Sequence, residues 1–403
     1  MSSTAEQMRA WNGPAILTFG FRPFFLGAAV WAVLIMVFWV LMLSGVLTLR
    51  TAFDPVSWHA HEFLFGYLSA VVAGFLLTAV PNWTGRLPIV GWSLGGLFAL
   101  WVVGRIAVSF SLMLPPVVVA VADLAMPVAL GLVLAREIIA GKNWRNLIVL
   151  CMLAVFTFAN AMFHWEAANG TYAAQGYGLR LGLATGLMMI AVIGGRVVPS
   201  FTRNWLVKRA AGRLPTSPMQ LFDKAALLVL LAALLMWVIL PDHWIAGFAL
   251  LLAGIVHAFR LARWAGYRTG AEPLVTVLHV AYGFVPLGSL AIGAEILWPG
   301  TFETASAQHL WMAGAIGLMT LAVMTRATLG HTGQPLTAGA ATVAIYLAMI
   351  VAVLARIGAG YCPSDAVWLH NVAGLGWIVA FGGFVVVYGP LLLRLPADKR
   401  TGG

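Results

Sequence analysis

Long apolar runs alternate with short polar connections along almost the whole chain. Crossing the hydrocarbon core of a bilayer takes roughly 20 apolar residues in a helix, and about twelve runs reach that length. Their approximate bounds are about 24–47, 58–81, 90–110, 114–140, 146–166, 178–199, 222–241, 243–264, 272–297, 305–327, 336–357 and 366–395. The pattern predicts an all-α, polytopic membrane helix bundle of about twelve transmembrane helices.

The connections between the runs are short, which predicts antiparallel neighbours. Pro115-Pro116 separates the third run from the fourth, and Pro241-Asp242 separates the seventh from the eighth. The longest polar connection, about 200–221, divides helices 1–6 (about 22–199) from helices 7–12 (about 222–395). Nothing between them has the composition of a soluble domain, so we interpret 1–403 as a single integral membrane domain.

Composition supports the same interpretation. The 403 residues are 62% hydrophobic and 9% charged, against about 25% charged in soluble domains. The net charge of +10 comes from basic residues in short connections, so the chain lacks the basic, aromatic-rich surface of a nucleic-acid-binding protein. Those residues lie mostly on the side of the N-terminus, which predicts that both termini are cytoplasmic and that the main partner is the lipid bilayer.

The candidate chemistry lies in the histidines. Ionisable groups inside a membrane are costly and usually face the bundle interior or a cavity, and imidazole is a common ligand of haem iron, copper and zinc. The predicted orientation places four of them in the outer half of the bundle: His59, His61, His164 and His309. We predict a metal centre or haem site from this group. The alternative is that each lies among headgroups and water at the interface.

The segment Trp58-His59-Ala60-His61-Glu62 opens the second predicted helix. His59 and His61 are roughly 200° apart around a regular helix, so they cannot both face one centre. Either the first turn is irregular or the two imidazoles have different roles, and Glu62 can orient a ligating imidazole through its second nitrogen. Arg105 and Asp123, both within apolar runs, are candidates for an internal ion pair with a structural role.

A second group of candidates lies toward the cytoplasmic side. His279, deep in its run, and His331 are weaker candidates for cofactor or metal binding. Arg196, Arg203 and Arg326 lie at or near Gly- and Thr-rich helix ends, where guanidinium groups suit carboxylate or phosphate. Haem propionates and lipid phosphates are both candidates, and the alternative is ordinary positive-inside anchoring.

Several motifs together resemble the NnrS family, the haem- and copper-containing membrane proteins associated with bacterial nitric-oxide responses. They follow one another in order from residue 21 to about 333: Phe21-Arg22-Pro23-Phe24-Phe25, Trp58–Glu62, Gly74–Arg86, Gly194–Asn204 and Met324–Gly333. The resemblance implies a multi-pass protein of the bacterial inner membrane with haem b and copper, linked to denitrification or nitrosative-stress defence. It does not assign the iron or copper ligands.

The function that the resemblance implies is the binding or turnover of nitric oxide, or protection against it. Whether the protein is a nitric-oxide-metabolising oxidoreductase stays open, as does its electron donor, a quinol or another reductant. A rival hypothesis is a twelve-helix secondary transporter for copper or a small haem-related solute, because two sets of six helices and Gly- and Pro-broken spans also suit alternating access.

Overall fold

The computed structural model describes residues 11–85, 88–209 and 212–394, and Arg86, which closes one of the motifs above, lies outside them. The described chain is helical and contains no strand. Its α-helices are α2 (Phe21–Leu43), α3 (Pro55–His61), α4 (Leu68–Thr84), α5 (Trp92–Ser109), α6 (Pro116–Ala140), α7 (Leu147–Ala168), α8 (Tyr177–Met189), α9 (Gly195–Val207), α10 (Leu221–Ile239), α11 (Trp244–Ala262), α12 (Pro273–Leu297), α13 (Thr304–His309), α14 (Met319–His331), α15 (Ala340–Tyr361) and α16 (Ala366–Leu393).

Twelve helical segments of the described chain are long and apolar enough to cross a membrane. The prediction of an all-α, multi-pass membrane protein is therefore confirmed. Exposed tryptophans lie near the ends of several spans, where aromatic side chains sit at the level of the lipid headgroups. They are Trp92, Trp144, Trp165, Trp244, Trp298 and Trp368.

Three of the spans contain a π-helical segment between two α-helices. These segments are η2 (Glu62–Tyr67) between α3 and α4, η6 (Ile190–Gly194) between α8 and α9, and η8 (Leu310–Leu318) between α13 and α14. A π segment shifts the side chains that follow it around the helix axis and is frequent at functional sites. After η6 the helix continues through Pro199 to Val207, so the polar connection predicted from about 200 begins only after that residue.

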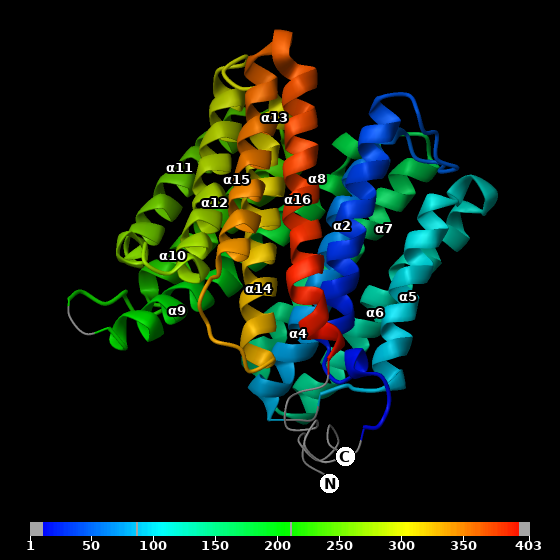
Figure 1. Cartoon of the computed structure of the whole chain (residues 1–403). Helices are drawn as coiled ribbons and strands as arrows, with labels where there is room; N and C mark the ends of the chain where they lie inside the picture. Colours follow the sequence, from blue (N-terminus) through cyan, green and yellow to red (C-terminus); the bar gives the residue numbers. More distant parts are fainter. Residues whose placement is uncertain (1–10, 86–87, 210–211, 395–403) are drawn as a thin grey trace. The chain divides into compact units, whose positions relative to one another are not determined.

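The chain forms two compact units. The first comprises the described parts of 1–182, 327–335 and 384–403, and the second comprises 183–326 and 336–383, again as far as described. In the first unit α5 packs beside α6, and in the second α10, α11 and α12 lie side by side (Figure 1). Both tight connections predicted from the prolines thus join neighbouring helices.

The Phe21–Phe25 motif has a structural role in the first unit. Arg22 is buried, and its Nη1 donates hydrogen bonds to the carbonyl oxygens of Leu392, at 2.9 Å, and Arg394, at 2.6 Å. The last carbonyls of a helix have no partner within the helix. The guanidinium of Arg22 therefore caps α16 and joins the start of α2 to the end of that helix.

Candidate metal centre

The local sequence explains where α3 begins and why His61 is its last residue. The Asp54 side chain caps the start of α3 by accepting hydrogen bonds from the backbone N–H groups of Val56, at 3.0 Å, and Ser57, at 2.9 Å. Pro55 occupies the first turn, where its missing N–H costs nothing. The helix is short, because η2 begins at Glu62 directly after His61.

His59 and His61 point into different surroundings. The ring of His59 stacks on Trp39, with a centroid distance of 4.2 Å and an interplanar angle of 21°, and packs against Phe63. His61 is fully buried and faces the polar residues of α6 and α7. Because the two histidines are two positions apart on a helix, their side chains point in directions roughly 200° apart. Only His61 therefore contributes to the buried cluster described next.

Three donor atoms converge in the interior of the first unit. The Nε2 atoms of His61 and His164 lie 3.1 and 2.9 Å from Asp123 Oδ2, and all three donors lie within 4.8 Å of one another. In a tetrahedral site with metal–ligand distances of about 2.0–2.1 Å, neighbouring donors are roughly 3.3 Å apart, so a metal ion needs the two His–Asp distances to lengthen by only roughly 0.2–0.4 Å. The donor set therefore fits a metal ion.

Further polar residues hold these three donors in position. Glu62 Oε1 lies 3.0 Å from His61 Nδ1, the kind of contact with the second nitrogen that orients a ligating imidazole. Asn160, one turn before His164 on α7, donates from Nδ2 to Asp123 Oδ2 at 2.8 Å. The side chains of all these residues are buried. The cluster is therefore fixed by residues of four segments: α3, η2, α6 and α7.

Arg105 of α5 binds both carboxylates. Its Nη1 donates to Glu62 Oε1 and Oε2, at 2.7 and 2.8 Å, and its Nη2 forms an ion pair with Asp123 Oδ1. The other Asp123 oxygen is thereby left to face the imidazoles. Gly104 permits this contact, because a Cβ at that position would lie 3.0 Å from the Asp123 Cα. The internal ion pair predicted between Arg105 and Asp123 is present.

The charges of the cluster do not cancel. Glu62 and Asp123 carry two negative charges and Arg105 one positive charge, all of them buried. With neutral imidazoles the net charge is therefore minus one. A buried net charge is strongly unfavourable, and one further positive charge, such as a proton on an imidazole or a copper(I) ion, would balance it, whereas a divalent cation would leave a net charge of plus one.

The family model described as NnrS protein matches residues 15–395, nearly the whole chain. The chain belongs to the NnrS family. No curated protein matches it. Membership agrees with the resemblance carried by the sequence motifs, and it covers both compact units and all twelve spans of this NnrS-family chain.

His309, the fourth outer candidate, belongs to the second unit. It ends α13 directly before η8, just as His61 ends α3 before η2. Its Nδ1 lies 2.6 Å from the carbonyl oxygen of Ala305. A carbonyl oxygen only accepts, so Nδ1 carries the proton and the lone pair of the neutral ring is on Nε2. This arrangement is typical of a metal-ligating imidazole.

A polar group near His309 includes Glu303, which directly precedes the membrane span that begins at Thr304. Glu303 accepts hydrogen bonds from the Ser306 hydroxyl, at 2.5 Å, and the Ser306 backbone N–H, at 2.7 Å, and Arg356 Nη1 lies 3.5 Å away. Burial alone would raise the pKa of Glu303, but the Ser306 hydrogen bond and the Arg356 charge lower it below its ordinary value. The carboxylate is therefore held in its charged form.

The weaker candidates lie elsewhere. His279 is buried in the second unit, where its Nε2 lies 2.8 Å from the Thr202 hydroxyl, whereas its Nδ1 has no hydrogen-bond partner among the described residues. His331 belongs to the first unit and packs against the rings of Phe19 and Phe21. Neither histidine is part of the His61 cluster.

The three arginines at the helix ends differ in exposure. Arg203 is exposed, whereas Arg196 is half-buried one residue into α9. The guanidinium of Arg326 lies 4.0 Å from the centroid of the Phe201 ring, a cation–π contact. Within the described chain this contact holds Arg326 in place, and it identifies no anionic ligand.

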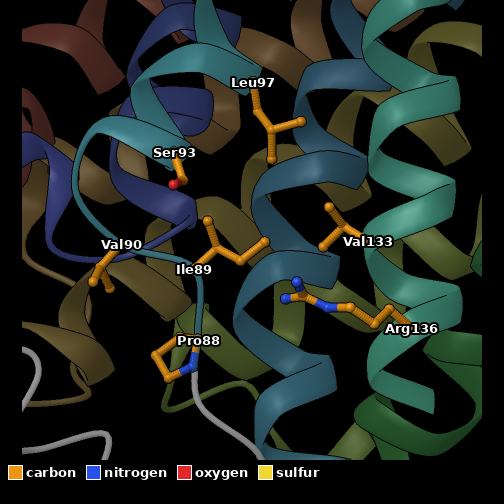
Figure 2. A pocket seen from close by; sticks show the side chains of 7 residues that line it. All are labelled: Pro88, Ile89, Val90, Ser93, Leu97, Val133 and Arg136. Carbon is orange, nitrogen blue, oxygen red and sulfur yellow. The ribbon is translucent and has the colours of Figure 1, made fainter. Parts of the chain in front are cut away.

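A cavity of about 430 Å³ opens near the start of α5, separate from the histidines. Figure 2 shows Pro88, Ile89 and Val90 on one side of it and Val133 and Arg136 on the other. Arg136 is largely exposed and pairs with Glu137 at 2.7 Å. Ser93 and Arg136 make this lining partly polar, and it brings together no set of metal donors.

Sequence reasoning assigned Arg105 and Asp123 a structural role and missed that Asp123 is a donor of the cluster. The available signal was a carboxylate in an apolar run at the depth of the outer histidines. Asn160 shares a helix face with His164 at a spacing of four, and that relation does bring both to Asp123.

Proposed function

We propose that this chain is a haem- and copper-binding protein of the bacterial inner membrane that binds or turns over nitric oxide. Membership of the NnrS family and the buried His61–Asp123–His164 cluster support the proposal. The single observation that carries it is the convergence of two imidazole nitrogens and one carboxylate oxygen from three membrane spans. Two imidazoles with a carboxylate suit copper(II), and they also suit ferrous iron.

The residues of the cluster have distinct roles in this proposal. His61, His164 and Asp123 would hold the ion, which supplies an open coordination position and one-electron chemistry when bound. Glu62 fixes the tautomer and orientation of His61 through Nδ1. Arg105 engages both carboxylates and limits the site's negative charge. Nitric oxide is uncharged and can reach such a site through the bilayer.

For haem b, His309 would be the residue that holds the iron, because its Nδ1 proton is fixed by the Ala305 carbonyl oxygen. Arg326 would not hold the propionates of that same haem. It is 17 residues further along the interrupted helix, up to about 25 Å at 1.5 Å per residue, which exceeds the width of one macrocycle. Arg326 would therefore bind a different anionic group, such as a lipid phosphate or a second haem near His279, and Arg196 and Arg203 are candidates for the same kind of group.

The test is metal and haem quantification on purified full-length protein, with His59→Ala as the control beside His61→Ala and His164→Ala. We expect copper to be lost from the His61 and His164 variants and retained in the His59 variant, since His59 lies outside the cluster. The haem absorption spectrum of the wild type should shift on addition of nitric oxide. Unchanged copper in the His61 variant, or a spectrum indifferent to nitric oxide, would overturn the assignment. Iron at this site instead of copper would correct the metal alone.

A second candidate is the secondary transporter, which the three π-interrupted spans favour. Transporters build their substrate sites where membrane helices are broken. Proteoliposomes distinguish the two functions: uptake of copper ions into vesicles by colourless protein supports transport, whereas red protein without uptake supports the haem–copper function.

A further inference from the structure

A second buried polar cluster lies in the second unit and shares no residue with the candidate metal and haem ligands discussed above, although His279 lies three residues before its Tyr282 on α12. It consists of Asp223 on α10, His257 and Arg260 on α11, and Tyr282 on α12, and each is at most 1% exposed. Arg260 Nε donates to Asp223 Oδ1 at 2.9 Å, so this pair is neutral overall. The charges of the cluster are thus already balanced without Tyr282 and His257.

The hydrogen bonds around Tyr282 run in one direction. Arg260 Nη1 lies 2.8 Å from the Tyr282 hydroxyl, and His257 Nδ1 lies 2.9 Å from the same oxygen. A guanidinium only donates, so the phenol oxygen accepts from Arg260 and the phenolic proton points at His257 Nδ1. On its other side, His257 Nε2 donates to the carbonyl oxygen of Ala226 at 3.0 Å. The tautomer of His257 is therefore fixed, with its lone pair facing the phenol.

The chain of hydrogen bonds ends at the Ala226 carbonyl. A carbonyl oxygen accepts a hydrogen bond but does not carry a proton onward. A proton that moves from Tyr282 to His257 Nδ1 consequently stays within the pair and can return. This arrangement suits a proton that moves back and forth and does not suit conduction across the membrane.

The need of the Arg260 guanidinium for hydrogen-bond partners does not explain the cluster. The Nη2 atom of Arg260 has no hydrogen-bond partner among the described residues, although it is buried. It packs against Gly195, where a Cβ would lie 2.2 Å from it, while Nη1 bonds both Tyr282 and the Ala191 carbonyl in the π segment η6. The geometry favours the bond to the phenol over a complete set of guanidinium bonds.

We propose that Tyr282 is a redox-active tyrosine with His257 as its proton acceptor. A one-electron oxidant of high potential removes one electron from the phenol as the O–H proton moves to His257 Nδ1. The products are a neutral phenoxyl radical, an imidazolium and the reduced oxidant. Re-reduction by one electron returns the proton. Moving both particles together avoids a phenol cation radical, which a membrane interior disfavours.

Neighbouring aromatic rings give the electron a route. The ring of Trp264, itself fully buried, meets the Tyr282 ring edge-on at 4.6 Å, and the His257 ring stacks against it at 6.1 Å and 17°. Copper(II) and ferric haem are too weak to oxidise a phenol, so the oxidant has to be a stronger one-electron acceptor, such as a high-valent state of a bound metal, and the inference rests on the proposed function in this respect. A photochemical oxidant separates the two, because it needs no bound metal.

The experiment is photo-oxidation of the purified full-length protein in detergent by tris(bipyridine)ruthenium(III), followed by electron paramagnetic resonance with ring-deuterated tyrosine. We expect a long-lived tyrosyl radical in the wild type, its loss in Tyr282→Phe, and faster decay with lower yield in His257→Gln. Tyr346→Phe is the matched control, since Tyr346 is a buried tyrosine of the same unit whose hydroxyl lies 2.5 Å from that of Thr325. That variant should keep the long-lived signal.

Exposed tyrosines also oxidise, so lifetime and isotope effect identify the buried site. Decay of the wild-type radical should slow in deuterated solvent after long exchange, and this measurement needs no variant. A radical that persists in Tyr282→Phe, or an unchanged lifetime in folded His257→Gln, overturns the proposal. Loss of copper with the radical intact would overturn the metal assignment alone.

Discussion

The charge balance of the His61 cluster makes a quantitative prediction about Arg105. In Arg105→Met the guanidinium between Glu62 and Asp123 is replaced by an apolar side chain, and the buried net charge falls from minus one to minus two. Removing one partner of a buried ion pair typically costs about 3–5 kcal/mol. Because Arg105 serves two carboxylates, we expect its loss to reach the upper part of that range.

Glu62→Gln is the contrasting change. It brings the net charge to zero, and the amide oxygen can still accept from Arg105 and from Trp31 Nε1, which lies 2.7 Å from Glu62. We expect a loss of only about 1 kcal/mol, the size of one weakened hydrogen bond. The double variant should be more stable than Arg105→Met alone, since it removes one of the two unpaired carboxylates.

The assay is reversible unfolding of the purified protein in mixed micelles with a denaturing detergent, followed by far-ultraviolet circular dichroism. Equal losses for Arg105→Met and Glu62→Gln would refute the charge argument. So would strict additivity in the double variant, because neighbouring charges of one network should show coupling.

Three further predictions concern other contacts. Arg22→Gln should cost about 1.5–3 kcal/mol, because charged hydrogen bonds to the end of α16 are lost, and limited proteolysis should then cut the C-terminal end faster. Gly195→Ala should destabilise by about 1–3 kcal/mol in a thermal melt because its Cβ collides with a guanidinium, whereas Gly96→Ala, with nothing within 4 Å, should be neutral or stabilising by up to about 1 kcal/mol. Because the pKa of Glu303 is lowered in the folded protein, its carboxylate contributes stability above its ordinary pKa, and this stability is lost as the pH falls through the folded pKa. Glu303→Gln should therefore reduce the loss of stability at acid pH. An unchanged dependence of stability on acid pH would refute this contribution of Glu303.

Hydrophobicity is a local property of the sequence, and for that reason the twelve spans could be predicted from their length and composition. The positions of His61 and His164 near the ends of their spans could also be predicted, since they follow from where each residue stands in its apolar run. Which unit each histidine joins could not, because His309 resembles His61 locally and differs only in its tertiary neighbours.

The role of Asp123 as a donor could not be predicted from residue spacing, because it depends on which partner binds each of its two oxygens. Arg105 takes one of its oxygens, and only the other faces His61 and His164. The π segment at Glu62–Tyr67 contains no proline, so the sequence could not predict where the helix changes its geometry. Sequence periodicity assumes a constant rotation per residue, so it fails where the helix changes its turn.

The tight connection between α5 and α6 bears on how the protein is made. A charged residue at the centre of a span costs about 2.5–3.5 kcal/mol during insertion of a single helix, and Arg105 and Asp123, both within spans, would each impose a cost of up to that size separately. They lie on consecutive helices joined by a few residues around Pro115. When α5 and α6 enter the bilayer together as a helical hairpin, Arg105 and Asp123 can neutralise each other during synthesis, before α7, which carries His164, is inserted. The half of the site that stabilises the membrane-inserted chain would then form before the half that binds the ion.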